Sequence, residues 1–177
     1  MTEARFALLD RLSAGALVLW AGVALGVGLL AAPAVFQGVS SRMEAGASIG
    51  QALQRVDLLA WVAFSGALLL SGLPRWLAEV GDGPNPIGPL RLWVATLLAA
   101  LLMCMASTFI VTPRVEAHRL RLGAQLEALS QDHPDRQALR KAHGVSRQMF
   151  FLRVLLALGL ASTVGFLPRR REATEAS

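Results

Sequence analysis

Residues 92–112 read LWVATLLAALLMCMASTFIVT, a run of apolar and small residues in which no side chain carries a charge. A membrane-spanning helix needs about 20 such residues to cross the hydrocarbon layer. Two further runs without any charged residue cover residues 12–41 and 58–74. Together these runs predict an all-α integral membrane protein rather than a soluble domain.

The composition of the whole chain excludes an ordinary soluble enzyme. Of the 177 residues, 54% are hydrophobic and 16% are charged, whereas soluble domains carry about 25% charged residues. The mean hydropathy is +0.51. The single cysteine, Cys104, excludes an internal disulfide and a cysteine-based zinc site. The net charge of +5 does not indicate nucleic-acid binding, because the arginines flank apolar runs as they do around membrane spans.

Four spans are predicted within a single domain of residues 1–168, which forms a four-helix bundle in the lipid bilayer. Residues 169–177 follow as a basic and then polar C-terminal tail. The first span also has features of a signal peptide, since Ala32-Pro33-Ala34 resembles a cleavage site, but three more spans follow it. The spans cover approximately residues 14–36, 57–73, 92–112 and 148–167.

The connections between the spans differ in character. Residues 74–89 are rich in glycine and proline, which predicts a loop. Residues 37–56 and 113–147 have helix-forming sequence, so we expect helices that extend beyond the bilayer on the side opposite the termini. A basic run at residues 169–171 directly follows the last span, which favours a cytoplasmic position for both termini.

Four short stretches stand in order along the chain. They are LWAG at 19–22 with AAPAVF at 31–36, Ala45-Gly46 with Gly50, Thr112-Pro113-Arg114, and His143-Gly144-Val145-Ser146. In order and spacing they resemble the signatures of the transmembrane-protein-205-like family, a membrane domain of unknown function found in bacteria and eukaryotes. The resemblance implies a small polytopic helical protein, here of the bacterial inner membrane. Eukaryotic relatives are linked to platinum-drug resistance, which implies handling of small solutes or metals.

The charged residues nearest the spans give the first candidate site. Asp57 begins the second span, and Arg147 and Arg153 stand at the start of the fourth, on the same side of the membrane. Because a charge near the hydrocarbon is costly unless it is paired, we predict an Asp57–Arg153 ion pair between helices. We expect a structural pair, with a substrate or proton site as the alternative. Pro33 frees backbone carbonyls near the end of the first span, where they could line a cavity next to this pair.

A second candidate site lies in the long third connection. If its two helices form an antiparallel hairpin, Glu116 and His118 on one could approach His143 on the other. Imidazole and carboxylate ligands would suit a transition metal or haem iron. No cofactor is predicted outright, because these residues lack the i, i+4 spacing of helical metal sites and a histidine in a polar helix is usually solvated.

Glycines at a spacing of four residues suggest where helices approach closely. They form two pairs, Gly22 with Gly26 in the first span and Gly46 with Gly50 just outside the membrane. Such pairs allow close contact between helices. We expect packing inside the monomer, with a homodimer interface as the alternative.

Three functions remain open. The leading hypothesis is a non-enzymatic membrane protein that binds or helps move a small solute or metal species near Pro33, Asp57 and Arg153. The alternatives are a haem- or metal-bearing redox protein that uses His118 and His143, and a structural or scaffolding subunit. No phosphate loop, Ser-His-Asp arrangement or paired-carboxylate site is recognisable in the sequence, which favours a non-enzymatic reading.

Overall fold

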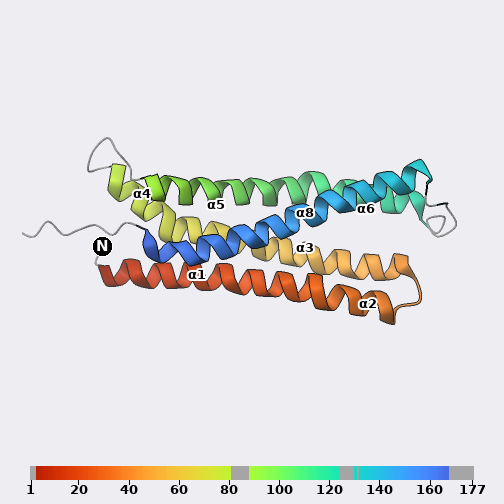
Figure 1. Cartoon of the computed structure of the whole chain (residues 1–177), viewed down its shortest axis with the longest axis horizontal. Coiled ribbons are helices and arrows are strands. Elements are labelled where there is room, and N and C mark those ends of the chain that lie inside the picture. Colours follow the sequence, from red (N-terminus) through yellow and green to blue (C-terminus); the bar gives the residue numbers. More distant parts are fainter. Residues whose placement is uncertain (1–2, 81–87, 124–129, 131, 168–177) are drawn as a thin grey trace, which may run out of the picture.

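The computed structural model describes residues 3–80, 88–123, 130 and 132–167, and the described chain forms four long helical rods (Figure 1). Each rod is long and apolar enough to cross a membrane, so the chain is an integral membrane protein with an all-α four-helix bundle. The first two rods comprise α1 (Glu3–Leu25), η1 (Gly26–Ala31) and α2 (Ala32–Gly38), then α3 (Arg42–Ala67), η2 (Leu68–Gly72) and α4 (Leu73–Val80). The last two comprise α5 (Gly88–Ala106), η3 (Ser107–Val111) and α6 (Thr112–Leu122), then α8 (Pro134–Thr163) and η4 (Val164–Phe166).

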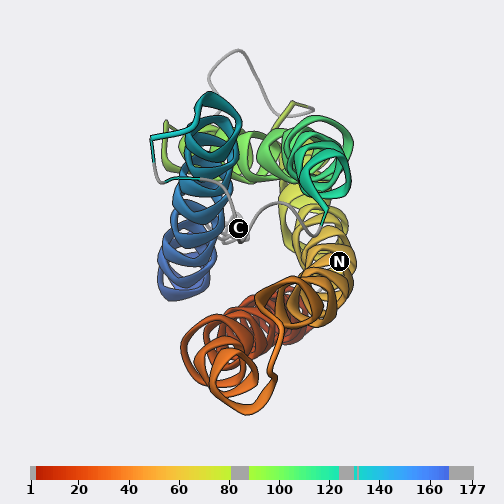
Figure 2. The ribbon, with the colours of Figure 1, turned by 90° about the vertical axis from the view of Figure 1, so that its right-hand side faces the viewer.

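The rods run alternately up and down and pack as a ring. Helix α1 packs against α3 and α8, and α5 packs against the same two helices on the other side of the bundle. At the end that carries the α2–α3 connection, α2 packs against α3 while α6 packs against α8, as seen along the bundle in Figure 2. The start of α1, the end of α8, the end of α4 and the start of α5 lie together at the opposite end (Figure 1).

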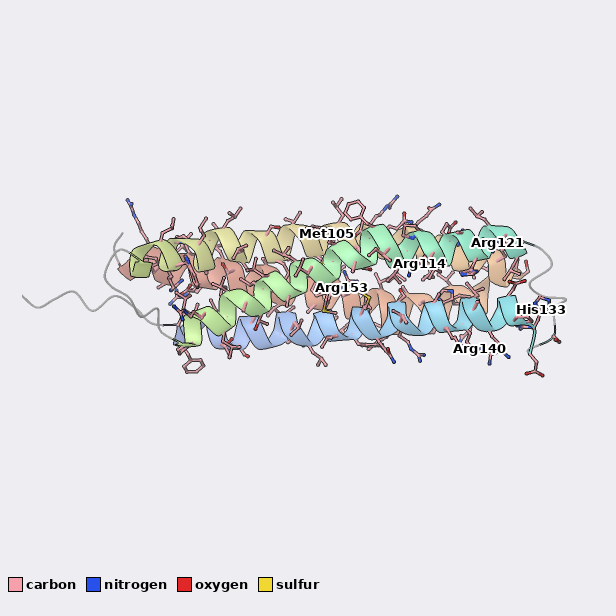
Figure 3. All side chains as sticks on the ribbon, turned by 90° about the horizontal axis from the view of Figure 1, so that it is seen from above. Met105, Arg114, Arg121, His133, Arg140 and Arg153 are labelled. Carbon is pink, nitrogen blue, oxygen red and sulfur yellow. The ribbon has the colours of Figure 1, made fainter. Side chains whose placement is uncertain are left out.

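The rods are longer than a bilayer requires. The first three each contain 35 residues, which corresponds to about 50 Å at 1.5 Å per residue, against a hydrocarbon layer of about 30 Å. The excess lies opposite the termini, where Arg121, His133 and Arg140 are found in Figure 3. The helices therefore extend beyond the bilayer on that side, as the sequence predicts.

Buried residues form a narrow seam along each rod. In α5 the buried side chains are Leu90, Trp93, Leu97, Ala100 and Cys104. Their alternating spacing of three and four residues is the heptad pattern of helices that cross at a shallow left-handed angle. The outer faces of the same helices carry exposed leucines, which are suited to contact lipid.

Three of the four rods contain a π-helical segment, and a proline follows each segment by two residues. Pro33 comes after η1, Pro74 after η2 and Pro113 after η3. Proline has no N–H to donate and its ring clashes with the carbonyl four residues earlier. A wider turn removes this clash, so the proline bends the rod locally without ending it.

This accommodation explains a difference from the sequence prediction. The loop expected from residue 74 does not begin there, because Pro74 lies inside the second rod, at the second position of α4, and this helix continues to Val80. The last helix begins at Pro134, where the His133 ring accepts a hydrogen bond from the Asp135 amide at 3.4 Å. The predicted C-terminal tail, residues 169–177, lies outside the described residues.

Candidate functional site

The structure contains the ion pair that the sequence predicts between the second and fourth rods. Arg153 of α8 donates a hydrogen bond from Nη2 to Asp57 Oδ1 of α3 at 2.8 Å. The side chain of Arg153 is 2% exposed and that of Asp57 is 14% exposed. The arginine is therefore the deeper partner, and Figure 3 shows it within the bundle.

Two residues of the third rod complete the cluster. Ser107, the first residue of η3, donates to Asp57 Oδ2 at 3.0 Å and accepts from Arg153 Nη2 at 3.5 Å. Arg153 Nη1 lies 3.6 Å from the sulfur of Cys104. Ser107 and Cys104 belong to the buried seam of the third rod, so three rods meet at this point.

One donor of the buried guanidinium remains unused. Within the described residues, Arg153 Nε is buried and has no hydrogen-bond partner. A guanidinium offers five donors in a planar fork that matches a carboxylate. Arg153 thus combines full burial, a single counter-charge and spare donor capacity, an arrangement that can hold a small anion.

A second buried ion pair lies at the other end of the bundle and was missed from the sequence. Asp10 of α1 accepts a hydrogen bond from Arg75 of α4 at 2.5 Å. Both residues stand at the termini side of the first two spans, so the charge-pairing argument that joined Asp57 to Arg153 also applies to them. Assigning residues 74–89 to a loop had placed Arg75 in water and concealed the pair.

Pro33 and Arg147 lie outside the Asp57–Arg153 cluster. Pro33 is exposed, and neither η1 nor α2 contains a buried residue. Arg147 is also exposed, although it precedes Arg153 by less than two helical turns. Both side chains are exposed, so neither belongs to the buried cluster, and a cavity lined by the carbonyls that Pro33 frees stays a prediction.

The residues of the proposed metal or haem site are distributed along the projecting helices. Glu116 is paired with Arg119 at 2.7 Å on the same helix. His118 is half-buried on α6, and His143 is exposed on α8. Within the described ranges, no group of three or more His, Cys, Asp or Glu side chains could hold a metal ion. Binding of haem or a transition metal stays a prediction.

Three of the four predicted packing glycines do not lie at close helix contacts. A Cβ added at Gly22, Gly26 or Gly46 would have no neighbouring atom within 4 Å. Gly22 follows the buried Ala21 by one residue, which turns it about 100° away from the seam. The prediction of packing inside the monomer is therefore corrected for these positions, and the homodimer alternative stays a prediction.

Other glycines make the close contacts. A Cβ at Gly28 would lie 3.2 Å from a phenylalanine ring of α8, and one at Gly72 would lie 3.3 Å from a tryptophan ring of α5. Both glycines belong to π-helical segments, whose positions the sequence analysis did not anticipate. At Gly50, the nearest atom to an added Cβ is Nη1 of Arg119, at 3.7 Å.

Comparisons with known proteins leave the family resemblance a prediction. No protein-family model, curated protein or solved structure matches the chain. The charged clusters within the bundle are therefore the features from which a function can be argued.

Proposed function

We propose that this integral membrane protein binds a small monocarboxylate at Arg153, where the solute takes the place of the Asp57 carboxylate. One observation carries the proposal. The arginine is fully buried inside the bundle, and its Nε has no partner within the described residues. Ionisable groups inside membrane helices are costly, and they commonly mark the path or the binding site of a solute.

The geometry supports a carboxylate as the ligand. The position opposite Arg153 is already occupied by a carboxylate, which also accepts a hydrogen bond from Ser107. A solute with the same group would meet the same donors. Asp57 is more exposed than Arg153, so the carboxylate rather than the guanidinium faces the route by which a solute would enter.

We also propose that the protein lies in the bacterial inner membrane with both termini in the cytoplasm. Support comes from the basic run at residues 169–171, which directly follows the last span. A cysteine placed at Ser130, in a variant whose Cys104 is replaced by serine, should then react with a membrane-impermeant maleimide added outside intact spheroplasts. Protection of this cysteine until the membrane is permeabilised would contradict the orientation.

The binding proposal predicts opposite effects for the two members of the ion pair. Asp57→Asn removes the internal competitor and leaves the arginine charge uncompensated, so formate and acetate should bind more tightly than to the unmodified protein. Arg153→Gln removes the anion partner and should abolish binding at this cluster. The readout is the unfolding temperature of detergent-purified protein titrated with sodium formate, compared with sodium gluconate at equal ionic strength. A ligand at 100 times its Kd stabilises by about 2.7 kcal/mol.

Arg147→Gln is the matched control, because it removes a positive charge from the exposed side of the same helix. It should leave the formate response unchanged. If formate stabilises Asp57→Asn no more than it stabilises Arg147→Gln, the proposal fails. A purely structural ion pair would give destabilisation in both pair variants and no saturable response to formate.

A further inference from the structure

The cluster around Arg75, at the termini end of the bundle, is as deeply buried as the one around Arg153. The side chains of Arg75 and Asp10 are 4% and 7% exposed. Arg75 also donates from Nη1 to the Ser71 carbonyl at 3.1 Å, and its guanidinium lies 5.1 Å from the ring centre of Phe6. Next to this pair, the hydroxyl groups of Ser13 and Ser71 form a hydrogen bond with an Oγ–Oγ distance of 2.8 Å.

This cluster also has unused hydrogen-bonding capacity. Asp10 Oδ1 is buried and has no hydrogen-bond partner in the part of the chain that the structure describes. A buried carboxylate oxygen without a partner is costly. The carboxylate is thus held on one oxygen only, which lowers the cost of replacing it with another carboxylate that satisfies both oxygens.

The two clusters contain similar chemical groups. Each contains an arginine from one rod, an aspartate from another, and a buried serine from a π-helical segment. At the first cluster the serine is Ser107, and at the second it is Ser71. The Ser107 hydroxyl contacts both Asp57 and Arg153, whereas the Ser71 hydroxyl contacts Ser13 and only the Ser71 carbonyl contacts Arg75. The shared arginine–aspartate pair is therefore the basis on which the two clusters should recognise the same class of ligand.

The clusters are separated by the thickness of a membrane. Asp57 and Arg75 lie on the same rod, and their separation in sequence corresponds to about 27 Å along it at 1.5 Å per residue. The hydrocarbon layer is about 30 Å thick. One arginine therefore stands near each boundary, with a seam of buried apolar residues that includes Ala60 and Ala63 between them.

We infer that Arg75 forms a second binding station for the same small monocarboxylate, at the membrane boundary nearest the termini. The inference rests on the proposed function, because the ligand class is taken from the Arg153 cluster. Two such sites give the solute a cationic partner at either boundary. Arg75 is the ligand-binding residue, and Ser71 positions its guanidinium.

The test isolates the second station by removing the first. In an Arg153→Gln background, Asp10→Asn should strengthen the saturable stabilisation by sodium formate, with a half-saturating concentration about tenfold lower than in the Arg153→Gln protein itself. Adding Arg75→Gln should abolish the response. Arg91→Gln in the same background is the control, because Arg91 is an exposed arginine of α5 at the same end of the bundle as Arg75. Asp10→Ser is the second variant if Asp10→Asn does not fold.

The outcomes separate the inference from the proposed function. If formate stabilises Asp10→Asn/Arg153→Gln and Arg75→Gln removes the effect, the second station is supported. If neither Asp10 variant responds more than the Arg91→Gln control, the inference is overturned. Asp57→Asn in an Arg75→Gln background tests the first station alone, so its response to formate shows independently whether the proposed function holds.

Discussion

Removing Arg153 alone should destabilise the bundle more than removing Arg153 and Asp57 together. Arg153→Met leaves the Asp57 carboxylate without its charged partner, and one-sided loss of a buried ion pair costs about 3–5 kcal/mol. The lower end of that range applies here, since Asp57 is 14% exposed and Ser107 still donates to it. The destabilisation by Asp57→Asn should lie at the upper end of the range, because the arginine that this change leaves unpaired is only 2% exposed.

The double variant contains no uncompensated charge and loses only hydrogen bonds. Hydrogen bonds between membrane helices contribute about 0.6 kcal/mol on average and about 1.7 kcal/mol at most. Asp57→Asn/Arg153→Met should therefore lose only about 1–2 kcal/mol. The two single changes should show a coupling energy of at least about 2 kcal/mol, larger than neutral hydrogen bonds produce.

Unfolding by sodium dodecyl sulfate in mixed micelles, followed by tryptophan fluorescence, measures this cycle. The chain has four tryptophans, and the indole N–H of Trp61 donates to Thr108 at 3.4 Å, one residue beyond Ser107. Ser107→Ala is the control for a lost hydrogen bond without a lost charge, and it should cost about 0.6 kcal/mol. A coupling energy below about 1.7 kcal/mol would refute the view that Asp57 and Arg153 form a desolvated charge pair.

Gly72→Ala should destabilise the protein by about 1–3 kcal/mol, because the added Cβ would lie 3.3 Å from a tryptophan ring. Gly22→Ala should be neutral or stabilising, because no atom lies within 4 Å of the added Cβ. Detergent unfolding of the two variants side by side distinguishes the effect of packing from that of helix propensity. Ser13→Ala and Ser71→Ala should each cost about 0.6 kcal/mol, and the double variant should cost less than their sum, since the two hydroxyls bond to each other; additive losses in the same unfolding assay would argue against that bond. Cys104 is the one cysteine of the chain and is fully buried. N-ethylmaleimide should therefore label it slowly in mild detergent and rapidly in sodium dodecyl sulfate, as followed by mass spectrometry. Rapid labelling of the native protein would contradict the position of Cys104 in the seam.

Much of the fold follows from hydropathy and charge. The charge-free runs at residues 12–41, 58–74 and 92–113 are long enough to define spans because water is absent from the hydrocarbon and the backbone must bond internally. The Asp57–Arg153 pair was also predictable, since a costly charge requires a partner and only residues at the same membrane boundary can supply one.

The π-helical segments account for much of what could not be predicted. Whether Pro74 ends a helix or bends it depends on the neighbouring rods, because packing can stabilise a wider turn that an isolated helix would not form. The position of Arg75 follows from that choice. Ser71 follows the buried Ala67 by four residues and Ser107 follows Cys104 by three, so their burial does follow from a helical period. Their position in π-helical segments does not.

Asp10 and Arg75 stand at the termini end of the buried seams, whereas Asp57 and Arg153 lie partway along theirs. Asp10 is the first buried residue of the α1 seam, and Arg75 continues the seam of the second rod into α4. An apolar side chain at such a position would pack as the rest of the seam does, and replacing a buried ion pair with apolar residues is often neutral or stabilising. Stability therefore gives no reason for two such pairs at opposite boundaries. Ligand binding gives one, because each pair leaves a buried polar atom without a partner in the described residues, Arg153 Nε in one and Asp10 Oδ1 in the other, and a carboxylate that replaced the aspartate would meet a buried arginine.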